Sequence, residues 1–466
     1  MRSRGLESER TAAYSMVAMN WRKPAYLSYA SLRGYRFPSF LAQYSREYAR
    51  GAGYETVRRA LGNLLRHCRQ SVPYYAERLQ SIESIPLEDA DPRECLCRLP
   101  ILTKDTIRAD FVKLQSTDLA CRKWSYNTSG GSTGEPVRLV QDREYDDRSK
   151  ALSMLCHALL GCDVGKPIVR LWGSERDLEG RSQSPKARFF NWLTNTTWLN
   201  AFRMSPERMR ECIATLNRVR PCLILAYAQA AYELARFAER EKLFLTPQRA
   251  VLTSAGTLYP FMREKIAQVF GCPVYNLYGS REVSVIGCEL PGLGGLWVPP
   301  WGNFVEIVDE SGRPLPPGAE GNIVVTCLTN YAMPLLRYWI GDRGALLPDD
   351  TVADPPGTQV LKHVSGRNVD VFRTRDQTLV DGEYFTHLLY FRPWVWKFQV
   401  VQKAHAHIVF KVVSTNGEPA RSELEDIAAK ARLAMGPGCR VDFEFAKDLP
   451  PHPSGKYRYT LSEVSA

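Results

Sequence analysis

The chain has 466 residues, of which 44% are hydrophobic, and a formal net charge of +11 at pH 7. At about 150 residues per domain, this length predicts two or three domains. No apolar run approaches the ~20 residues that a membrane helix needs, and the first ten residues, MRSRGLESER, lack the apolar segment of a signal peptide. We therefore expect a cytoplasmic protein with no membrane partner.

The positive charge does not indicate a nucleic-acid partner, because the basic residues are spread along the chain with acidic residues between them. A solvated surface is the first interpretation, and a general attraction to anionic substrates or carrier proteins is the second. The twelve cysteines have no regular spacing, which favours reduced, buried thiols over a disulfide framework or a metal knuckle.

Residues 1–94 are predicted to be mainly helical, since apolar positions return every three or four residues. From about 120 to 345, β-branched or aromatic runs such as PIVRLW and PVYNLY alternate with helical patterns such as AAYELARFAEREKL. This alternation predicts largely parallel sheets covered by helices. The stretch 303–328 differs, because its two strand patterns are joined by a Gly/Pro-rich turn, and it predicts a small antiparallel β unit that closes the large domain.

After Gly366 the pattern changes to strand candidates around a single helical pattern, RSELEDIAAKARLAM, which predicts an α+β domain. The fold class is therefore α/β, with a large N-terminal domain of mostly parallel sheets covered by helices, a small β unit, and a smaller α+β C-terminal domain. We expect three parts: a helical N-terminal part of the large domain, the rest of that domain, and the C-terminal domain, over residues 1–94, 95–366 and 367–466.

The segment Tyr126–Pro136, YNTSGGSTGEP, combines hydroxyl donors with glycines that leave room for backbone N–H groups to face an anion. It predicts a phosphate-binding turn, and the alternative is a solvated Gly/Ser turn. Glu135 and Pro136 stand where a P-loop carries its lysine. The residues expected to contact phosphates are Thr128, Ser129, Gly130, Gly131, Ser132, Thr133 and Gly134.

Three distant segments carry a resemblance when taken in order: NLYGSREVS from Asn276, NYAMPLLRYWIGDRG from Asn330, and PSGKY from Pro453. With them the chain resembles the adenylate-forming ligases, the superfamily of acyl-CoA synthetases, luciferases and adenylation domains. It is most similar to the branch of phenylacetate-CoA ligase and CapK, which includes coenzyme F390 synthetase. The resemblance covers roughly residue 95 to the end. It implies ATP and Mg²⁺ as cofactors, CoA as a co-substrate, and a C-terminal domain that acts as a mobile lid.

The resemblance implies particular roles in nucleotide chemistry. Lys456 would bridge the carboxylate and the α-phosphate, because an ammonium is a compact charge; the alternative is an exposed tail lysine. Glu282 would be a ligand for the Mg²⁺ that accompanies ATP. Tyr278 would stack on adenine, unless it is a core tyrosine. Asp342 would accept both ribose hydroxyls, unless flanking arginines make it an ion pair, and Arg367 would lie near the ribose and phosphates.

Further positions match the nucleotide site and, less closely, an acyl pocket. The additional nucleotide-binding residues are Ala255, Gly256, Asn276, Gly279 and Ser280. The expected apolar wall of the acyl pocket consists of Tyr227, Trp172 and Phe202, although aromatic residues at such positions are most often core.

The sequence departs from the family pattern at three places. The SAE motif is Ser254, Ala255, Gly256 here, so a carboxylate is missing. The hinge position that is usually acidic or Lys is Val369. Some relatives hold a structural zinc, but a Trp stands at the position of its histidine ligand, so we expect no zinc site and a buried Cys288.

The pattern as a whole predicts an AMP-forming ligase that adenylates a carboxylic acid, with aromatic or apolar acids as the candidates, and transfers the acyl group to CoA. Alternative acceptors are the pantetheine of a carrier protein or an amine, because the hinge departure touches the second half-reaction. A catalytically silent ligase-fold binding protein is the rival class. Against it stand Lys456, Glu282 and Asp342 together, since a scaffold does not require their three chemistries. The acid and the oligomeric state stay open.

Overall fold

The structure is a computed structural model of the chain. The residues that it describes are 20–80, 92–128, 137–172, 184–201, 206–256, 258–348, 358–367, 371–376, 379–390, 392, 394–414, 419–447, 449 and 460–464.

The described N-terminal part is helical. Helix α3 shows why: Val57, Leu61, Leu64, Leu65 and Cys68 are buried and recur at helical spacing, so they form one apolar face. The helices before the first strand, with η1 a 3-10 helix, are α1 (Arg22–Leu32), α2 (Phe37–Ala49), α3 (Tyr54–Ser71), α4 (Pro73–Gln80), α5 (Pro92–Cys97), α6 (Lys104–Ala109) and η1 (Leu119–Cys121).

Strands and helices then alternate, as the sequence predicts. The strands up to the change of direction are β1 (Trp124–Thr128), β2 (Arg138–Asp142), β3 (Ile168–Trp172), β4 (Thr196–Asn200), β5 (Leu223–Tyr227), β6 (Val251–Ser254) and β7 (Val274–Ser280). The helices among them are α7 (Arg143–Leu159), α9 (Pro185–Thr194), α10 (Pro206–Val219), α11 (Ala228–Arg240) and α12 (Pro260–Phe270). The later strands of the large domain are β8 (Ser284–Glu289), β9 (Leu296–Trp297), β10 (Asn303–Val308), β11 (Gly321–Cys327), β12 (Tyr338–Leu346) and β13 (Val360–Arg367).

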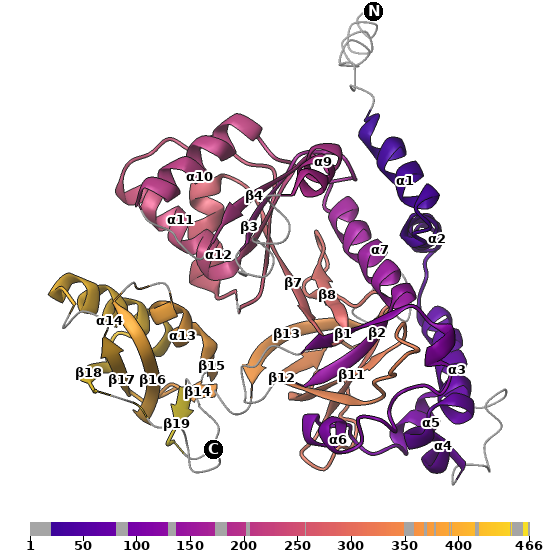
Figure 1. The fold of residues 1–466 in the computed structure, drawn as a ribbon. Helices are drawn as coiled ribbons and strands as arrows, with labels where there is room; N and C mark the ends of the chain where they lie inside the picture. The colour runs from indigo at the N-terminus through magenta and orange to yellow at the C-terminus, as the bar shows by residue number, and fades with distance from the viewer. Residues whose placement is uncertain are drawn as a thin grey trace, which may run out of the picture.

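One mixed sheet runs through the large domain in the order β10-β11-β12-β13-β9-β8-β7-β6-β5-β3-β4 (Figure 1). The pairs from β4 to β7 are parallel, whereas β7 pairs antiparallel with β8 and every pair from there to β10 is antiparallel. The predicted α/β class is confirmed. The expected β unit, β10 with β11, is the edge of this sheet, and the antiparallel part is larger than predicted because strand patterns alone do not reveal strand direction.

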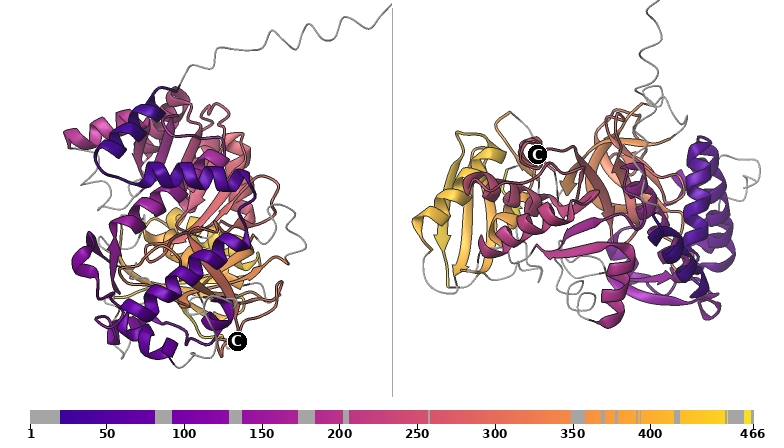
Figure 2. Two further views of the ribbon diagram at one scale, coloured as in Figure 1. Left: turned by 90° about the vertical axis from the view of Figure 1, so that its right-hand side faces the viewer. Right: turned by 90° about the horizontal axis from the view of Figure 1, so that it is seen from above.

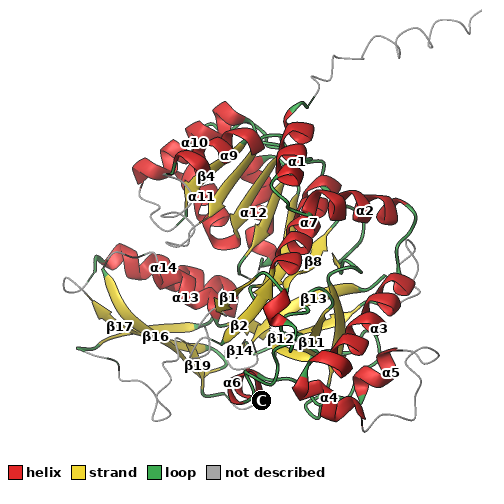
Figure 3. Ribbon diagram, turned by 45° about the vertical axis from the view of Figure 1, so that its right-hand side comes forward, coloured by secondary structure: helices red, strands yellow, loops and turns green. Residues whose placement is uncertain are grey.

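Helices cover both faces of the parallel half (Figure 3). Alternate residues along each strand point to opposite faces. Val169, Ile224 and Val251 therefore pack in a core with α10, α11 and α12, while Leu223 and Leu252 pack in another core with α1, α2 and α7. Burial on both faces explains the nearly continuous apolar runs of these strands.

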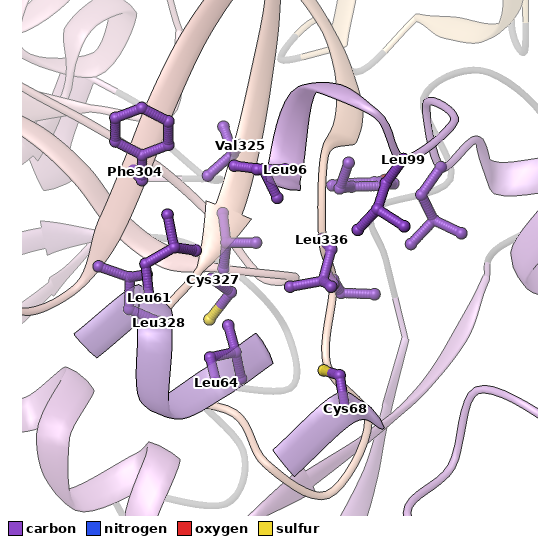
Figure 4. Packing of buried hydrophobic residues seen from close by; sticks show 14 of the residues in the cluster. Leu61, Leu64, Cys68, Leu96, Leu99, Phe304, Val325, Cys327, Leu328 and Leu336 are labelled. Atoms are coloured by element: carbon purple, nitrogen blue, oxygen red, sulfur yellow. The ribbon is translucent and has the colours of Figure 1, made fainter. Parts of the chain in front are cut away.

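The antiparallel half packs against the N-terminal helices. Leu61, Leu64 and Cys68 of α3 lie against Leu328 and Leu336, in a cluster shown in Figure 4. Other labelled members of this cluster are Leu96, Leu99, Phe304, Val325 and Cys327. The packing joins helices from the start of the chain to strands more than two hundred residues later.

A buried ion pair sits at the start of β12. Arg337 is 2% exposed and pairs with Glu306 of β10 at 3.1 Å. Its guanidinium also donates to the carbonyl oxygens of Cys97, Leu99 and Gly312 at 3.1, 2.8 and 2.8 Å. Through one side chain, Arg337 therefore connects the end of α5 and the segment after it, the β10–β11 connection, and the residue that directly precedes β12.

The C-terminal domain is a four-stranded sheet in the order β18-β17-β16-β19, with two helices and a two-stranded ribbon. Its elements are β14 (Val371–Arg373), β15 (Leu379–Asp381), α13 (Glu383–Tyr390), β16 (Val395–Ala404), β17 (His407–Ser414), α14 (Arg421–Met435), β18 (Arg440–Phe445) and β19 (Thr460–Ser462). The predicted α+β character is confirmed. The expected boundaries near 94 and 366 stay predictions.

This domain lies against α11 and α12, on the side of the parallel half away from the N-terminal helices (Figure 2). Charged and aromatic side chains make the contact, with Lys430 pairing with Glu233 of α11 and Tyr384 packing on Phe261 of α12. Lys430 of α14, 5% exposed, pairs with Glu233 at 2.7 Å and with Asp426 at 2.9 Å, and Arg236 reaches Asp426 at 3.2 Å. Burial acts to raise the pKa of Asp426, but Lys430 and Arg392 outweigh it and hold that pKa far below its usual value. The carboxylate therefore stays ionised in the docked pose.

None of the helices in the described ranges is both long and apolar enough to cross a membrane. The twelve cysteines are free thiols, and all but Cys97 and Cys121 are buried, which agrees with the sequence prediction.

We expect Arg337→Met to lower the free energy of unfolding by about 3–5 kcal/mol, because Glu306 would be left as a buried charge without its partner. The double variant Arg337→Met/Glu306→Leu should recover some of the lost free energy, because no buried charge is left without a partner. The recovery should be incomplete, because the carbonyls of Cys97, Leu99 and Gly312 still lack their donor. Urea denaturation measures both. The control is Arg313→Met, because the pair of Arg313 with Asp309 is exposed to solvent and should contribute little to stability. Equal losses for Arg337→Met and Arg313→Met would contradict the buried-pair account.

Candidate active site

The candidate site lies where the sheet changes from parallel to antiparallel. The parallel strands β3, β5 and β6 end at Trp172, Tyr227 and Ser254, and β7 ends at Ser280 before the turn into β8. The carboxyl ends of parallel strands meet at one edge of a sheet, and ligands of α/β proteins bind in the crevice outside that edge. The predicted site residues of four strands are thus brought to one edge.

The predicted phosphate turn is carried by an antiparallel arm. Strand β1 pairs with β2, and Thr128, the last residue of β1, lies opposite Arg138. The backbone N–H of Thr128 donates to the side chain of Asn127 at 2.8 Å. Ser129, Gly130, Gly131, Ser132, Thr133 and Gly134 lie outside the described residues, so their predicted role stays a prediction.

Glu282 lies in the short turn between β7 and β8 and is 7% exposed. Its backbone N–H donates to Ser280 Oγ at 3.2 Å, and the hydroxyl of Tyr338 donates to its carboxylate at 3.4 Å. The hydroxyl of Tyr145 donates to its carbonyl oxygen at 3.4 Å. Burial raises the pKa of Tyr145 well above its ordinary value, so this hydroxyl keeps its proton. The turn therefore presents one well-held carboxylate, a hard oxygen donor of the kind that Mg²⁺ prefers.

Tyr278 and Asp342 meet across the sheet. The hydroxyl of Tyr278, on β7, donates to Asp342 Oδ2 at 2.6 Å. Asp342 lies on β12 directly opposite Arg367 of β13, whose side chain is outside the description. The predicted adenine, ribose and phosphate residues are therefore neighbours, although they are far apart in the sequence.

The two arginines that flank Asp342 make ion pairs with other carboxylates. Arg337 pairs with Glu306, and Arg343 pairs with Glu310 at 3.1 Å. The alternative that these arginines hold Asp342 as a structural ion pair therefore has no support in these contacts.

The structure describes two of the three residues that are expected to form the apolar wall of the acyl pocket. The rings of Trp172 and Tyr227 pack with centroids 4.4 Å apart, and Tyr227 is opposite Ser254 in the β5–β6 pair. After Ser254 the backbone turns through Ala255 at φ 54° and Gly256 at φ 145°, a region that L-residues with side chains rarely adopt. A strained alanine at the end of a strand is the kind of backbone feature that clusters at ligand sites. Phe202 lies outside the described residues.

Asn276 and Gly279 shape β7 itself. The N–H of Asn276 donates to Glu289 of β8 at 2.8 Å, and Arg263 holds the same carboxylate at 2.8 and 3.0 Å. A Cβ on Gly279 would lie 2.5 Å from the carbonyl oxygen of Ser284. Glycine is therefore required here for the two strands to approach each other.

Lys456 and the expected hinge at 368–370 also lie outside the described residues, so the lysine's approach to the site stays a prediction. Cys288 is fully buried, as predicted. Among the residues whose placement the structure gives, no group of three or more His, Cys, Asp and Glu side chains is arranged to hold a metal ion.

Several residues that contact the site were not singled out from the sequence. They are Gln141, Tyr145, Asn303 and Tyr338, which support the Glu282 turn from β2, α7, β10 and β12. Tyr338 lies in the RYWIGDRG part of the segment NYAMPLLRYWIGDRG, so its position carried a signal. Gln141, Tyr145 and Asn303 lie in no recognisable motif, so nothing in the sequence was a reason to select them. The contacts of these residues depend on the tertiary fold.

Two family models and several known proteins match the chain. A family model described as AMP-binding enzyme matches residues 195–329, and one described as CapK C-terminal domain matches residues 372–463. Protein CapK of Staphylococcus aureus is 26% identical over 374 residues, 79% of this chain and 80% of that protein. Phenylacetate-coenzyme A ligase of Aromatoleum evansii is 21% identical over 325 residues, 68% of this chain and 70% of that protein.

The fold is also similar to that of a solved structure, 2-hydroxyisobutyryl-CoA ligase in the postadenylation state. The TM-score is 0.58 at 16% identity, and the match covers 87% of this chain and 89% of that one. The two family models and these relatives support a place for the chain in the adenylate-forming superfamily and, within it, in the CapK branch.

The close approach at Gly279 leads to a stability prediction. Gly279→Ala should lower the free energy of unfolding by about 1–3 kcal/mol, the cost of overpacking, because the new methyl group would meet backbone that cannot move without opening the β7–β8 pair. The control is Gly438→Ala, whose Cβ meets nothing within 4 Å. Denaturant titration compares the two, and a Gly279→Ala protein as stable as the control would contradict the close approach.

Proposed function

We propose that this protein is an ATP-dependent, AMP-forming ligase that adenylates a carboxylic acid and transfers the acyl group to CoA. The observation that carries the proposal is the meeting of Tyr278 with Asp342, at the same sheet edge as the buried carboxylate of Glu282. The similarity to the adenylate-forming superfamily supports the same chemistry.

The nucleotide would lie across the β7 end of the sheet. Asp342 would accept the ribose hydroxyls, Tyr278 would face the base, and Arg367 would approach the phosphates from β13. Ala255, Gly256, Asn276, Gly279 and Ser280 would form the backbone wall of the pocket, and the Thr128–Gly134 turn would hold the phosphates. The Tyr278 hydroxyl already occupies one oxygen of Asp342, so it would orient that carboxylate for the ribose.

Glu282 would hold Mg²⁺ together with phosphate oxygens. The fit rests on the donor set: a nearly buried carboxylate whose position is fixed by Tyr338 and Ser280. When bound, the ion would neutralise charge on the phosphates. Lys456 would supply the second positive charge, at the oxygens shared by the attacking carboxylate and the α-phosphate.

The acid would lie beyond the α-phosphate, against Trp172, Tyr227 and Phe202. The close packing of the Trp172 and Tyr227 rings favours an aromatic or otherwise apolar acid. CoA is the proposed acceptor, and the pantetheine of a carrier protein would approach with the same thiol chemistry.

Lys456→Ala should slow pyrophosphate release by about 10²–10³-fold, the usual loss when one preorganised transition-state donor is removed. ATP affinity and thermal stability should change little, because the lysine acts on charge that develops during the reaction. The control is Lys447→Ala, an exposed lysine of the same domain. A panel of aromatic and aliphatic acids identifies the substrate first. Equal rates for the two lysine variants would contradict the assignment of Lys456.

The acceptor is tested by omitting CoA. Without an acceptor the acyl-adenylate should stay bound, so that pyrophosphate release stops after about one equivalent per active site, the burst that marks an accumulating intermediate. Adding CoA should restore continuous turnover and yield acyl-CoA. Undiminished turnover without CoA would favour a product that is not a thioester, and ATP binding without pyrophosphate release for any acid would support a binding protein instead.

A further inference from the structure

A chain of hydrogen bonds connects the strand that leads into the glycine turn with the turn that carries Glu282. Asn127 Nδ2, on β1, donates to Gln141 Oε1 at 2.8 Å. Gln141 Nε2, on β2, donates to the carbonyl oxygens of Arg281 at 2.8 Å and of Glu282 at 3.3 Å. Gln141 is 4% exposed, so water competes little for these contacts.

Asn127 anchors the other end of this chain. Its Oδ1 accepts the N–H of Thr128, the last residue before the glycine turn, and its Nδ2 also reaches the carbonyl oxygen of Arg281 at 3.4 Å. The two amides therefore set the distance between the end of β1 and the Glu282 turn.

Other buried side chains support the Glu282 turn from different directions. Asn303 donates to the carbonyl oxygens of Val283 at 3.1 Å and Val285 at 2.7 Å, and Tyr145 donates to that of Glu282. Gln141 in addition accepts a hydrogen bond from β1. Loss of the Gln141 side chain would leave the Glu282 turn in place but would remove the connection between this turn and β1.

We propose that Gln141 is a positioning residue that holds the end of β1, at Thr128, against the turn of Glu282 and thereby sets the affinity of the site for the Mg²⁺ of the ATP complex. The inference rests on the proposed function. Its physical reason is that Mg²⁺ requires nearly ideal octahedral geometry at about 2.0–2.1 Å and usually binds between a carboxylate and phosphate oxygens. The position of the carboxylate relative to the phosphate oxygens therefore determines the affinity for the ion.

The test is the Mg²⁺ dependence of ATP binding, measured by calorimetry, which requires no turnover. Gln141→Leu keeps the bulk of the side chain and removes its donors and acceptor. We expect it to weaken Mg²⁺-dependent ATP binding by about tenfold, the lower end of what the loss of a residue that orients a metal ligand costs. Binding of ATP in the presence of EDTA should be unchanged.

The matched control is Gln248→Leu. Gln248 is also buried and also donates to a carbonyl oxygen, that of Thr246, but it belongs to the loop before β6. A general loss of stability would therefore affect both variants, whereas the Mg²⁺ dependence should change only in Gln141→Leu. Asn127→Leu should cause a similar loss, and the double variant should lose no more than either single one, because both break the same connection.

Equal Mg²⁺ affinity in Gln141→Leu and Gln248→Leu would overturn the inference. A wild-type protein that binds MgATP but releases no pyrophosphate with any acid would overturn the proposed function alone, because the calorimetric comparison would still decide the role of Gln141. A wild-type protein that does not bind MgATP would overturn both.

Discussion

The reversal of strand direction between β7 and β8 is the constraint on which the site depends. The chain must pass from a parallel strand into an antiparallel one within the turn at Arg281–Val283, and Gly279 leaves no room for a side chain there. Ser284 takes φ 62°, a conformation that a serine rarely adopts. Such a turn persists because buried donors on three other elements hold its carbonyl oxygens. The result is a carboxylate fixed at the edge of the sheet.

The antiparallel half brings the second part of the site to this turn. The buried pair of Arg337 with Glu306 fixes the residue that directly precedes β12, and five residues after Arg337, Asp342 meets Tyr278. One strand therefore has a residue that stabilises the fold at its start and a proposed ligand-binding residue in its middle. Docking of α14 on α11 through Lys430 fixes the C-terminal domain on the far side of the parallel strands in this pose.

The sequence was sufficient to predict the α/β class and the α+β C-terminal domain, because strand and helix patterns differ in their periodicity. The family resemblance implied a shared nucleotide site for Tyr278 and Asp342, and the structure brings these two side chains into contact. It was not sufficient for the extent of the antiparallel sheet, since a strand pattern does not encode the direction of its neighbour. The structural role of Arg337 could not be predicted from the sequence either. It stands in the same segment as Asp342, and only the tertiary fold shows that its partner is Glu306.

The central claim is that one nucleotide binds where β7 ends, between Tyr278, Asp342 and Glu282. A crystal structure with a non-reactive acyl-adenylate mimic, an acyl-sulfamoyl adenosine, tests it most directly. The account predicts ribose hydroxyls within hydrogen-bond distance of Asp342, the base beside Tyr278 and the acyl group against Trp172 and Tyr227. An adenylate bound at any other edge of the sheet, with no ribose hydroxyl within hydrogen-bond distance of Asp342, would contradict it.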